Sequence, residues 1–155
     1  MRVCIRQVKD VDTLMRWRRE VIGTVFGTAP SDALLEANLR YYMEHIPDGS
    51  HIAMLAEADG VAAGCGAICL TDELPSPDNP SGRCAYIMNI YVRKEFRGHG
   101  VGHAIVRRLV EIARELDCDK IYLETTDEAR SLYSGIGFKD LPGIMKYGED
   151  LNIES

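Results

Sequence analysis

A chain of 155 residues, 46% hydrophobic and 27% charged, has an ordinary globular composition and is long enough to bury one hydrophobic core. Its formal net charge of −6 at pH 7 argues against nucleic-acid binding, which needs a basic surface. No stretch approaches 18 consecutive apolar residues, so no membrane partner is expected. We therefore expect a single domain over residues 1–155.

The first third of the chain predicts a strand followed by two helices. Residues 2–8 alternate apolar and polar side chains, as a half-buried strand does. Apolar residues then recur at helical spacing over residues 11–26. Ser31 is a good N-cap for a second helix. The apolar stripe of this second helix comprises Leu35, Leu39, Tyr42 and Ile46.

The middle of the chain predicts a strand hairpin, a loop and a further strand. Residues 51–70 are typical of two strands, and Asp59-Gly60 between them is a strong hairpin-turn signal. Residues 74–82 concentrate three prolines and a glycine, which indicates a loop. A strand over residues 84–92 follows this loop.

The last third predicts an amphipathic helix, a strand and a short final helix. The stripe of the amphipathic helix comprises Val101, Ile105, Leu109, Ile112 and Leu116. Residues 120–125 form a short strand, and a helix reaching Tyr133 comes next. Phe138 and residues 144–147 are predicted to add terminal strands. This order of elements is typical of an α+β protein, with a mixed sheet and helices on its faces.

Cysteine usage and the amino-terminal sequence indicate the compartment. The five cysteines are scattered and odd in number, without a C-x-x-C pair, so neither a disulfide framework nor a metal site is expected. The first ten residues, MRVCIRQVKD, lack the apolar run of a signal peptide. These features predict a cytoplasmic protein without a bound metal.

Residues 96–103, FRGHGVGH, place three glycines within five positions at the start of the amphipathic helix. Such a run fits a tight turn, a dinucleotide-binding loop or a pyrophosphate cradle. The dinucleotide fingerprint needs a glycine at position 103, where His103 stands, and no Gly-Lys-Ser/Thr follows for a nucleotide-triphosphate loop. We therefore favour phosphate binding by successive backbone N–H groups, aided by the helix dipole.

Two segments resemble motifs of one family. Arg97-Gly98-His99-Gly100-Val101-Gly102 resembles the Arg/Gln-x-x-Gly-x-Gly/Ala core of the GNAT superfamily of acyl-CoA-dependent N-acyltransferases. Downstream, residues 129–138 (ARSLYSGIGF) are similar to its Ala-x-x-Leu-Tyr-x-x-x-Gly-Phe motif. The resemblance is sharp over residues 84–140. It implies a mostly antiparallel sheet of six to seven strands, whose central parallel pair is splayed around coenzyme A.

The resemblance implies acetyl-CoA as cosubstrate. Its pyrophosphate would lie on the backbone N–H groups of the glycine run, and Arg97 would steer phosphate or brace the loop. Pantetheine would pair with the backbone of the strand that ends at Val92, as a peptide adds to a sheet edge. Thr126 stands where many members have asparagine. The implied cofactor-binding residues are Ile90, Tyr91, Val92, Arg97, Gly98, His99, Gly100, Val101, Gly102 and Thr126.

Acetyl transfer to an amine needs a proton donor for the leaving thiolate and an acceptor for the amine proton. Tyr133 occupies the tyrosine of the second motif, so the resemblance implies that it is the general acid. Glu73 is our prediction for the general base. The alternatives for the base are Glu124, Asp72, His51, His45 and a bound water.

The leading hypothesis is an N-acetyltransferase acting on a primary amine of a small molecule or peptide. A non-catalytic module that senses acyl-CoA would keep the glycine loop without needing Tyr133 as an acid. An NAD(P)-linked oxidoreductase is the third alternative. Many family members dimerise through terminal strands, which leaves a homodimer open.

The acceptor would be selected by the two amino-terminal helices and the loop over residues 72–82. Arg16, Arg18 and Arg19 surround Trp17 on the first helix, in an otherwise acidic chain. These arginines either meet an anionic acceptor or form a solvated face with Trp17 turned inward. We favour the solvated face.

Overall fold

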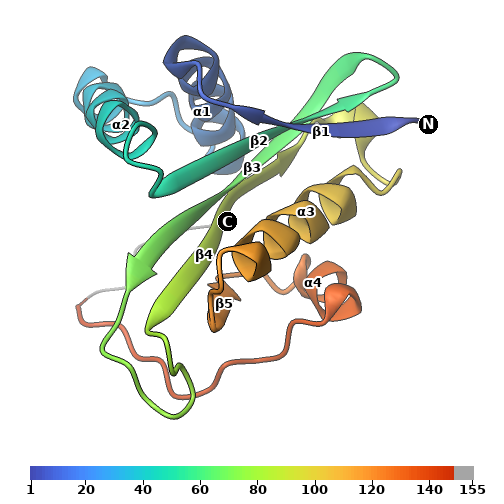
Figure 1. The fold of residues 1–155 in the computed structure, drawn as a ribbon. Helices are drawn as coiled ribbons and strands as arrows, with labels where there is room; N and C mark the ends of the chain where they lie inside the picture. Colours follow the sequence, from blue (N-terminus) through green and yellow to red (C-terminus); the bar gives the residue numbers. More distant parts are fainter. Residues whose placement is uncertain (149–155) are drawn as a thin grey trace.

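The computed structural model describes residues 1–148, which form one sheet and four α-helices (Figure 1). The strands are β1 (Val3–Val8), β2 (His51–Ala58), β3 (Val61–Asp72), β4 (Arg83–Val92) and β5 (Lys120–Leu123). The helices are α1 (Val11–Val25), α2 (Asp32–His45), α3 (Val101–Glu115) and α4 (Arg130–Ile136), with a 3₁₀ turn, η1 (Lys94–Phe96). The strands follow the order β1-β2-β3-β4-β5, antiparallel except for the parallel pair β4 and β5.

The α+β class and the mixed sheet are confirmed, but the sheet has five strands within the described residues. The predicted terminal strands are wrong, because Phe138 and residues 144–147 pair with no strand among residues 1–148. Gly143, with φ 95°, bends the backbone just before the apolar run. Met145 and Tyr147 are fully solvent-exposed, so nothing holds this segment against the sheet.

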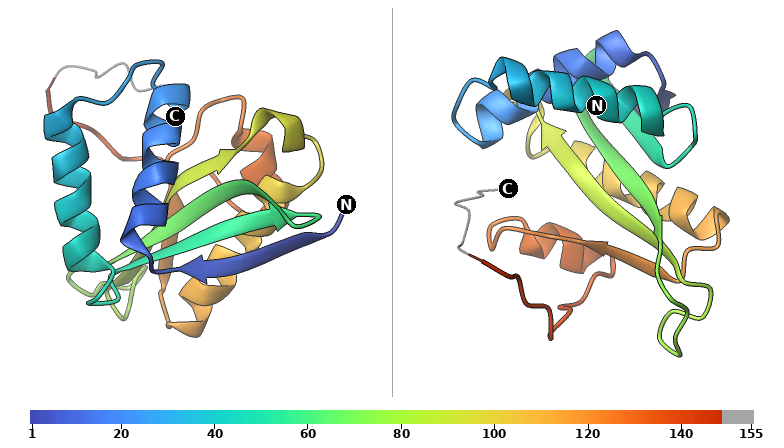
Figure 2. Two further views of the ribbon diagram at one scale, coloured as in Figure 1. Left: turned by 90° about the horizontal axis from the view of Figure 1, so that it is seen from above. Right: turned by 90° about the vertical axis from the view of Figure 1, so that its left-hand side faces the viewer.

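Helices cover both faces of the sheet (Figure 2). On one face, α3 and α4 enclose a core that includes Met54, Ile68, Ile87, Ile105, Leu109 and Tyr133. On the other face, α1 and α2 enclose a core that includes Trp17, Val21, Tyr42, Leu55, Cys65 and Tyr91. The predicted stripe of α3 is buried up to Ile112, whereas Leu116 ends the helix as an exposed C-cap residue.

The second helix begins as predicted, because the Ser31 hydroxyl accepts a hydrogen bond from the backbone N–H of Leu34. Its apolar stripe is less buried than predicted. Tyr42 is the buried residue of α2, while Leu39 is 37% exposed. The reason is its position: α2 packs mainly against α1 rather than lying flat on the sheet (Figure 2).

The hairpin between β2 and β3 turns at Asp59-Gly60, with φ of 49° and 81°, which confirms the predicted turn. No helix among residues 1–148 is long and apolar enough to span a bilayer.

Candidate active site

The glycine run forms a loop between η1 and α3. Gly98 and Gly100 have φ of 79° and 80°, a left-handed conformation that favours glycine. Apart from the adjacent residues, no heavy atom of residues 1–148 lies within 4 Å of where a Cβ would stand at either position, so this side of the loop is open. The backbone N–H groups of residues 98–103 have no hydrogen-bond partner in the described part of the chain.

These free N–H groups stand at the N-terminus of α3, where the helix dipole favours an anion. The loop is exposed, and Arg97 Nε donates to the Val92 carbonyl oxygen at 3.0 Å. This bond ties the loop to the end of β4, as a bracing role for Arg97 requires. His99 is exposed and His103 is half-buried at the first turn. The geometry therefore fits a pyrophosphate.

The parallel strands β4 and β5 separate near this loop. Their pairing runs from Cys84–Lys120 to Ile87–Leu123 and then stops. Beyond that point, the edge of β4 facing β5 has no strand partner from Met88 to Val92 within the described residues (Figure 1). This free edge presents unpaired backbone groups to an extended ligand, and it contains Ile90, Tyr91 and Val92.

A β-bulge shapes the free edge of β4. The register against β3 shifts between Cys65 and Ala67, opposite Asn89, whose φ is 58°. A Cβ on Gly66 would stand 2.6 Å from side-chain atoms of Ile105 and Ile90, so a larger residue beneath the bulge would force these side chains to shift. The bulge was not expected from the apolar pattern of residues 84–92. Its signal is an asparagine within an apolar strand, because asparagine tolerates the left-handed conformation.

Tyr133 lies on α4, on the α3 side of the sheet, with its ring 6.0 Å from that of Phe138. The residue is 8% exposed, and burial raises the pKa of its phenol. Within residues 1–148 the hydroxyl has no hydrogen-bond partner, and it is not among the fully buried polar atoms that lack one. The ring is therefore held in the core while the hydroxyl reaches accessible space.

Thr126 lies in the turn before α4, where its hydroxyl oxygen accepts a hydrogen bond from the Ala129 N–H at 3.2 Å. A hydroxyl that accepts this bond still has its own hydrogen to donate to a ligand.

Glu73 lies far from the separation of the strands. Its carboxylate oxygens are 3.0 and 3.2 Å from Lys120 Nζ, at the first residue of β5. Lys120 pairs with Cys84 of β4, and the six residues of extended strand from Cys84 to Ile90 span roughly 20 Å. This length of strand separates the ion pair from the free edge of β4. The Lys120 ammonium also lowers the pKa of Glu73, which weakens it as a base. This position gives Glu73 a surface ion pair rather than a place beside the thioester.

Glu124 follows β5 at the mouth of the separation. Tyr122, two residues earlier, pairs with Tyr86, and the two rings are 5.1 Å apart. Side chains two apart share a face, so Glu124 points to the same side. Burial and the nearby Glu124 carboxylate raise the pKa of Tyr86 to about 12.

This side of the sheet is the α1–α2 side, opposite Tyr133. Tyr86 pairs with Cys69, and Cys69 Sγ is 3.0 Å from the Tyr41 hydroxyl of α2. Tyr133 and Glu124 thus lie on opposite faces of the sheet.

The other residues considered as bases have structural partners or lie elsewhere. His51 is buried, with Nδ1 2.8 Å from the Tyr41 hydroxyl, and His45 Nδ1 is 2.7 Å from the Ser50 hydroxyl. Asp72 is exposed near Glu73, at the end of β3 away from the bulge.

The arginine cluster of α1 is not uniform. Trp17 is buried and Arg16 and Arg19 are exposed, as the solvated-face prediction requires. Arg18 is half-buried and bonds to Asn89 of the bulge, which the sequence did not indicate.

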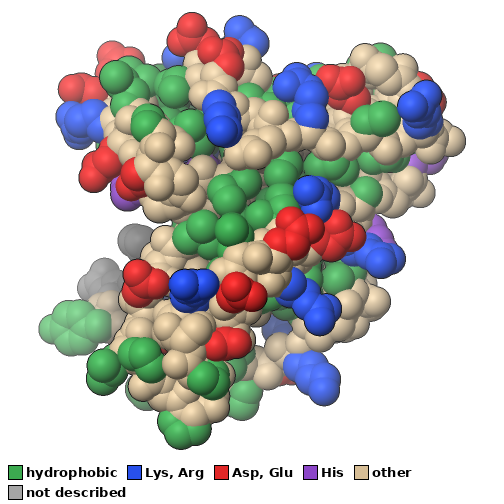
Figure 3. All heavy atoms as spheres, viewed as in Figure 1, with side chains coloured by type: hydrophobic (Ala, Val, Ile, Leu, Met, Phe, Trp, Pro, Cys, Tyr) green, Lys and Arg blue, Asp and Glu red, His purple; other side chains and the backbone are tan. Residues whose placement is uncertain are grey.

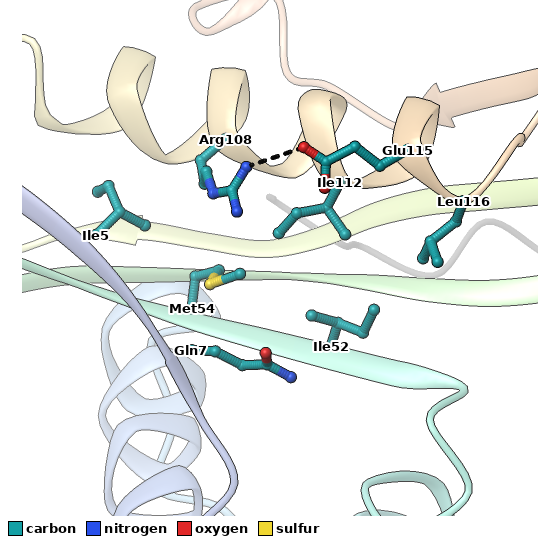
Figure 4. Close-up of a pocket in the computed structure, with 8 residues that line it drawn as sticks. All are labelled: Ile5, Gln7, Ile52, Met54, Arg108, Ile112, Glu115 and Leu116. Carbon is teal, nitrogen blue, oxygen red and sulfur yellow. Dashed lines mark ion pairs between the residues drawn. The ribbon is translucent and has the colours of Figure 1, made fainter.

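A pocket of about 280 Å³ lies elsewhere, between α3 and the strands β1 and β2 (Figure 4). It is lined by Ile5, Gln7, Ile52, Met54, Arg108, Ile112, Glu115 and Leu116. Figure 3 shows hydrophobic side chains gathered on this face beside charged ones. The pocket contains none of the predicted site residues. Among residues 1–148, no three His, Cys, Asp or Glu side chains are grouped to hold a metal ion.

Comparisons with known proteins agree with this geometry. The Acetyltransferase (GNAT) family matches residues 11–138. The chain is 31% identical over 124 residues to glucosamine 6-phosphate N-acetyltransferase 1 of Oryza sativa subsp. japonica, covering 77% of this chain and 73% of that protein. It is 30% identical over 123 residues to an amino-acid acetyltransferase of Mycobacterium tuberculosis, covering 79% and 63%.

The fold is also similar to that of a protein from Clostridium acetobutylicum, described as a predicted acetyltransferase, whose crystal structure contains acetyl-CoA. The two share a TM-score of 0.84 and 26% identity over 95% of this chain and 96% of that one. The family match covers both sequence motifs, the separated strands and the amino-terminal helices. The chain therefore belongs to the GNAT acetyltransferase family.

Proposed function

We propose that this protein transfers the acetyl group of acetyl-CoA to a primary amine of a small molecule or peptide. The observation that carries the proposal is the row of free N–H groups over residues 98–103, beside the free edge of β4. The first feature suits a pyrophosphate and the second an extended pantetheine chain. Membership of the GNAT family supports the same assignment.

Acetyl-CoA supplies an activated acyl group, and the amine nitrogen forms a bond to its carbonyl carbon as the carbon–sulfur bond breaks. Backbone N–H groups on the free edge of β4, near Ile90, stabilise the negative charge that develops on the carbonyl oxygen. Tyr133 gives its phenolic proton to the leaving thiolate. Its raised pKa keeps this proton in place at neutral pH.

The amine must lose a proton, and we assign Glu124 as the acceptor in place of Glu73. Glu124 stands at the mouth of the separated strands, while Glu73 is tied to Lys120 at the other end of β4. The proton that Glu124 takes up passes to solvent, and Tyr133 regains its proton from solvent.

The test is thiol release from acetyl-CoA over a panel of primary amines, with calorimetric binding of acetyl-CoA and of NAD(P) alongside. We expect acetyl-CoA binding and amine-dependent thiol release. Acetyl-CoA binding without turnover on any amine would favour the sensing module. Binding of NAD(P) in place of acetyl-CoA would contradict the proposal.

A further inference from the structure

Arg18 reaches from α1 across to α2 and β4. Its Nε donates to Asn38 Oδ1 at 3.0 Å, and its Nη1 donates to Asn89 Oδ1 at 2.9 Å. Both partners are neutral amide oxygens. Within residues 1–148 no carboxylate forms an ion pair with Arg18 at 4.0 Å or less. In the part of the chain that the structure describes, the charge of this half-buried guanidinium is therefore uncompensated by a carboxylate.

Arg93, the neighbouring half-buried arginine, shows what a structural arginine looks like in this protein. Its Nη2 and Nε lie 2.9 and 3.0 Å from the two carboxylate oxygens of Glu20, and its guanidinium stacks on the Trp17 ring at 4.3 Å. The chain thus supplies a carboxylate for Arg93. A partly desolvated cation without such a partner is costly, so the lack of a carboxylate at Arg18 among residues 1–148 points to a bound anion as its partner.

The guanidinium of Arg18 has donors to spare. An arginine carries five N–H groups, and two of those of Arg18 are used by Asn38 and Asn89. The remaining ones form part of a planar fork, whose geometry suits the oxygen atoms of a carboxylate or phosphate. The two asparagines hold the fork in place, so little conformational entropy is lost when an anion binds.

Arg18 lies close to the free edge of β4 and on the same side of the sheet as Glu124. Asn89, its partner, directly precedes Ile90 on the free edge of β4. Arg18 lies on the α1–α2 side of the sheet, the side that Glu124 shares and that is opposite Tyr133. An amine that enters from this side, with its nitrogen at the separated strands, has its other end within reach of α1.

We propose that Arg18 binds an anionic group of the acceptor, so that the substrate is an amine bearing a carboxylate or phosphate. This inference rests on the acetyl transfer proposed above and names the chemical class of its acceptor. The guanidinium pairs with the anion, and the amine at the other end of the molecule meets the acetyl group.

The experiment compares acceptors that differ only in charge. One pair is 4-aminobutanoate and 4-aminobutanamide, and the other is glucosamine 6-phosphate and glucosamine; the two pairs distinguish a carboxylate from a phosphate. For the wild type, kcat/KM should favour the charged member of at least one pair by about 10-fold or more. In Arg18→Met, kcat/KM for the charged acceptor should fall by about 10- to 100-fold, mostly because KM rises. The value for the neutral acceptor should change little.

Arg19→Met is the matched control, because it removes the same charge from an exposed position next along α1. It should keep the wild-type preference. Arg18→Lys retains the charge without the fork and should keep part of the preference. If Arg18 only supports the bulge, Arg18→Met lowers kcat/KM equally for charged and neutral acceptors, and the inference is overturned.

Equilibrium binding of the four amines to the coenzyme-A-loaded protein separates this inference from the proposed function. If no amine is acetylated, the proposed function fails, and binding still tests Arg18. Tighter binding of a charged member, lost in Arg18→Met and kept in Arg19→Met, supports the inference. Absence of any charge preference across both pairs overturns it, even if neutral amines are acetylated. Arg18→Lys serves in the binding assay if Arg18→Met does not fold.

Discussion

Lowering the pH from 7.5 to 4.5 should destabilise the folded protein through His51. This side chain is 4% exposed between α2 and the sheet. Its Nδ1 lies 2.8 Å from the Tyr41 hydroxyl, while its Nε2 is buried without a partner. In the doubly protonated ring, the Nε2–H group would therefore be buried with no acceptor among residues 1–148. Burial, with smaller contributions from His45 and Arg18, lowers the pKa of His51 from 6.5 to about 4.

The sign and size of the effect follow from these pKa values. A histidine in the unfolded chain binds a proton below pH 6.5, whereas the folded protein resists it down to about pH 4. His51 therefore contributes stability that is present above pH 6.5 and is lost as the pH falls toward 4. The loss in unfolding free energy is about 1.4 kcal/mol at pH 5.5 and about 2.5 kcal/mol at pH 4.5.

The assay is urea unfolding at 25 °C, followed by the fluorescence of Trp17, the single and buried tryptophan. His51→Asn keeps a polar group near the Tyr41 hydroxyl but does not titrate. We expect its unfolding free energy to fall less than that of the wild type between pH 7.5 and 4.5, by about 2.5 kcal/mol. His99→Asn removes an exposed histidine and should retain the wild-type loss. Equal losses in wild type and His51→Asn would refute the reasoning.

Three further outcomes concern the active site. Tyr133→Phe should lower kcat by about 10²- to 10⁴-fold with acetyl-CoA affinity nearly unchanged, in steady-state kinetics paired with calorimetry; an unchanged kcat would remove the general-acid role. Gly100→Ala places a Cβ where φ is 80° and the loop is open, so acetyl-CoA binding should weaken by about 10-fold or more, while Gly23→Ala inside α1 leaves it intact. Glu124→Gln should lower kcat/KM most at low pH, where free amine is scarce. Glu73→Gln should have little effect on turnover, because Glu73 is paired with Lys120. A loss of turnover in Glu73→Gln but not in Glu124→Gln would restore Glu73 as the base.

Local patterns predicted most elements because each rests on interactions between near neighbours. Asp59-Gly60 supplied the left-handed residues that a tight hairpin needs, and Ser31 supplied a cap for α2. The terminal strands failed for a related reason. An apolar run such as residues 144–147 has strand character, but a strand also needs a free edge to pair with, and sequence periodicity does not report one.

The active site divides in the same way. The glycine loop and Tyr133 lie within contiguous motifs, so both could be proposed as site residues from the sequence alone. The proposed general base lies in neither motif, and the choice between the candidate carboxylates depends on which end of a strand lies near the loop. Glu73 and Glu124 look alike as carboxylates beside strands, and only the register of β4 against β5 separates them.

By itself the sequence determined the parts of this protein that resemble the family motifs: a glycine-rich loop before an amphipathic helix, and a tyrosine in a second motif. These are local features, set by backbone freedom and side-chain spacing along a few residues. The tertiary structure alone decided that β5 leaves β4 after Leu123, that Asn89 bulges, and that Arg18 reaches Asn89 from α1 with no carboxylate partner among residues 1–148. Those facts join residues as far as 71 positions apart, and such contacts arise from packing helices on a sheet rather than from neighbours in the chain.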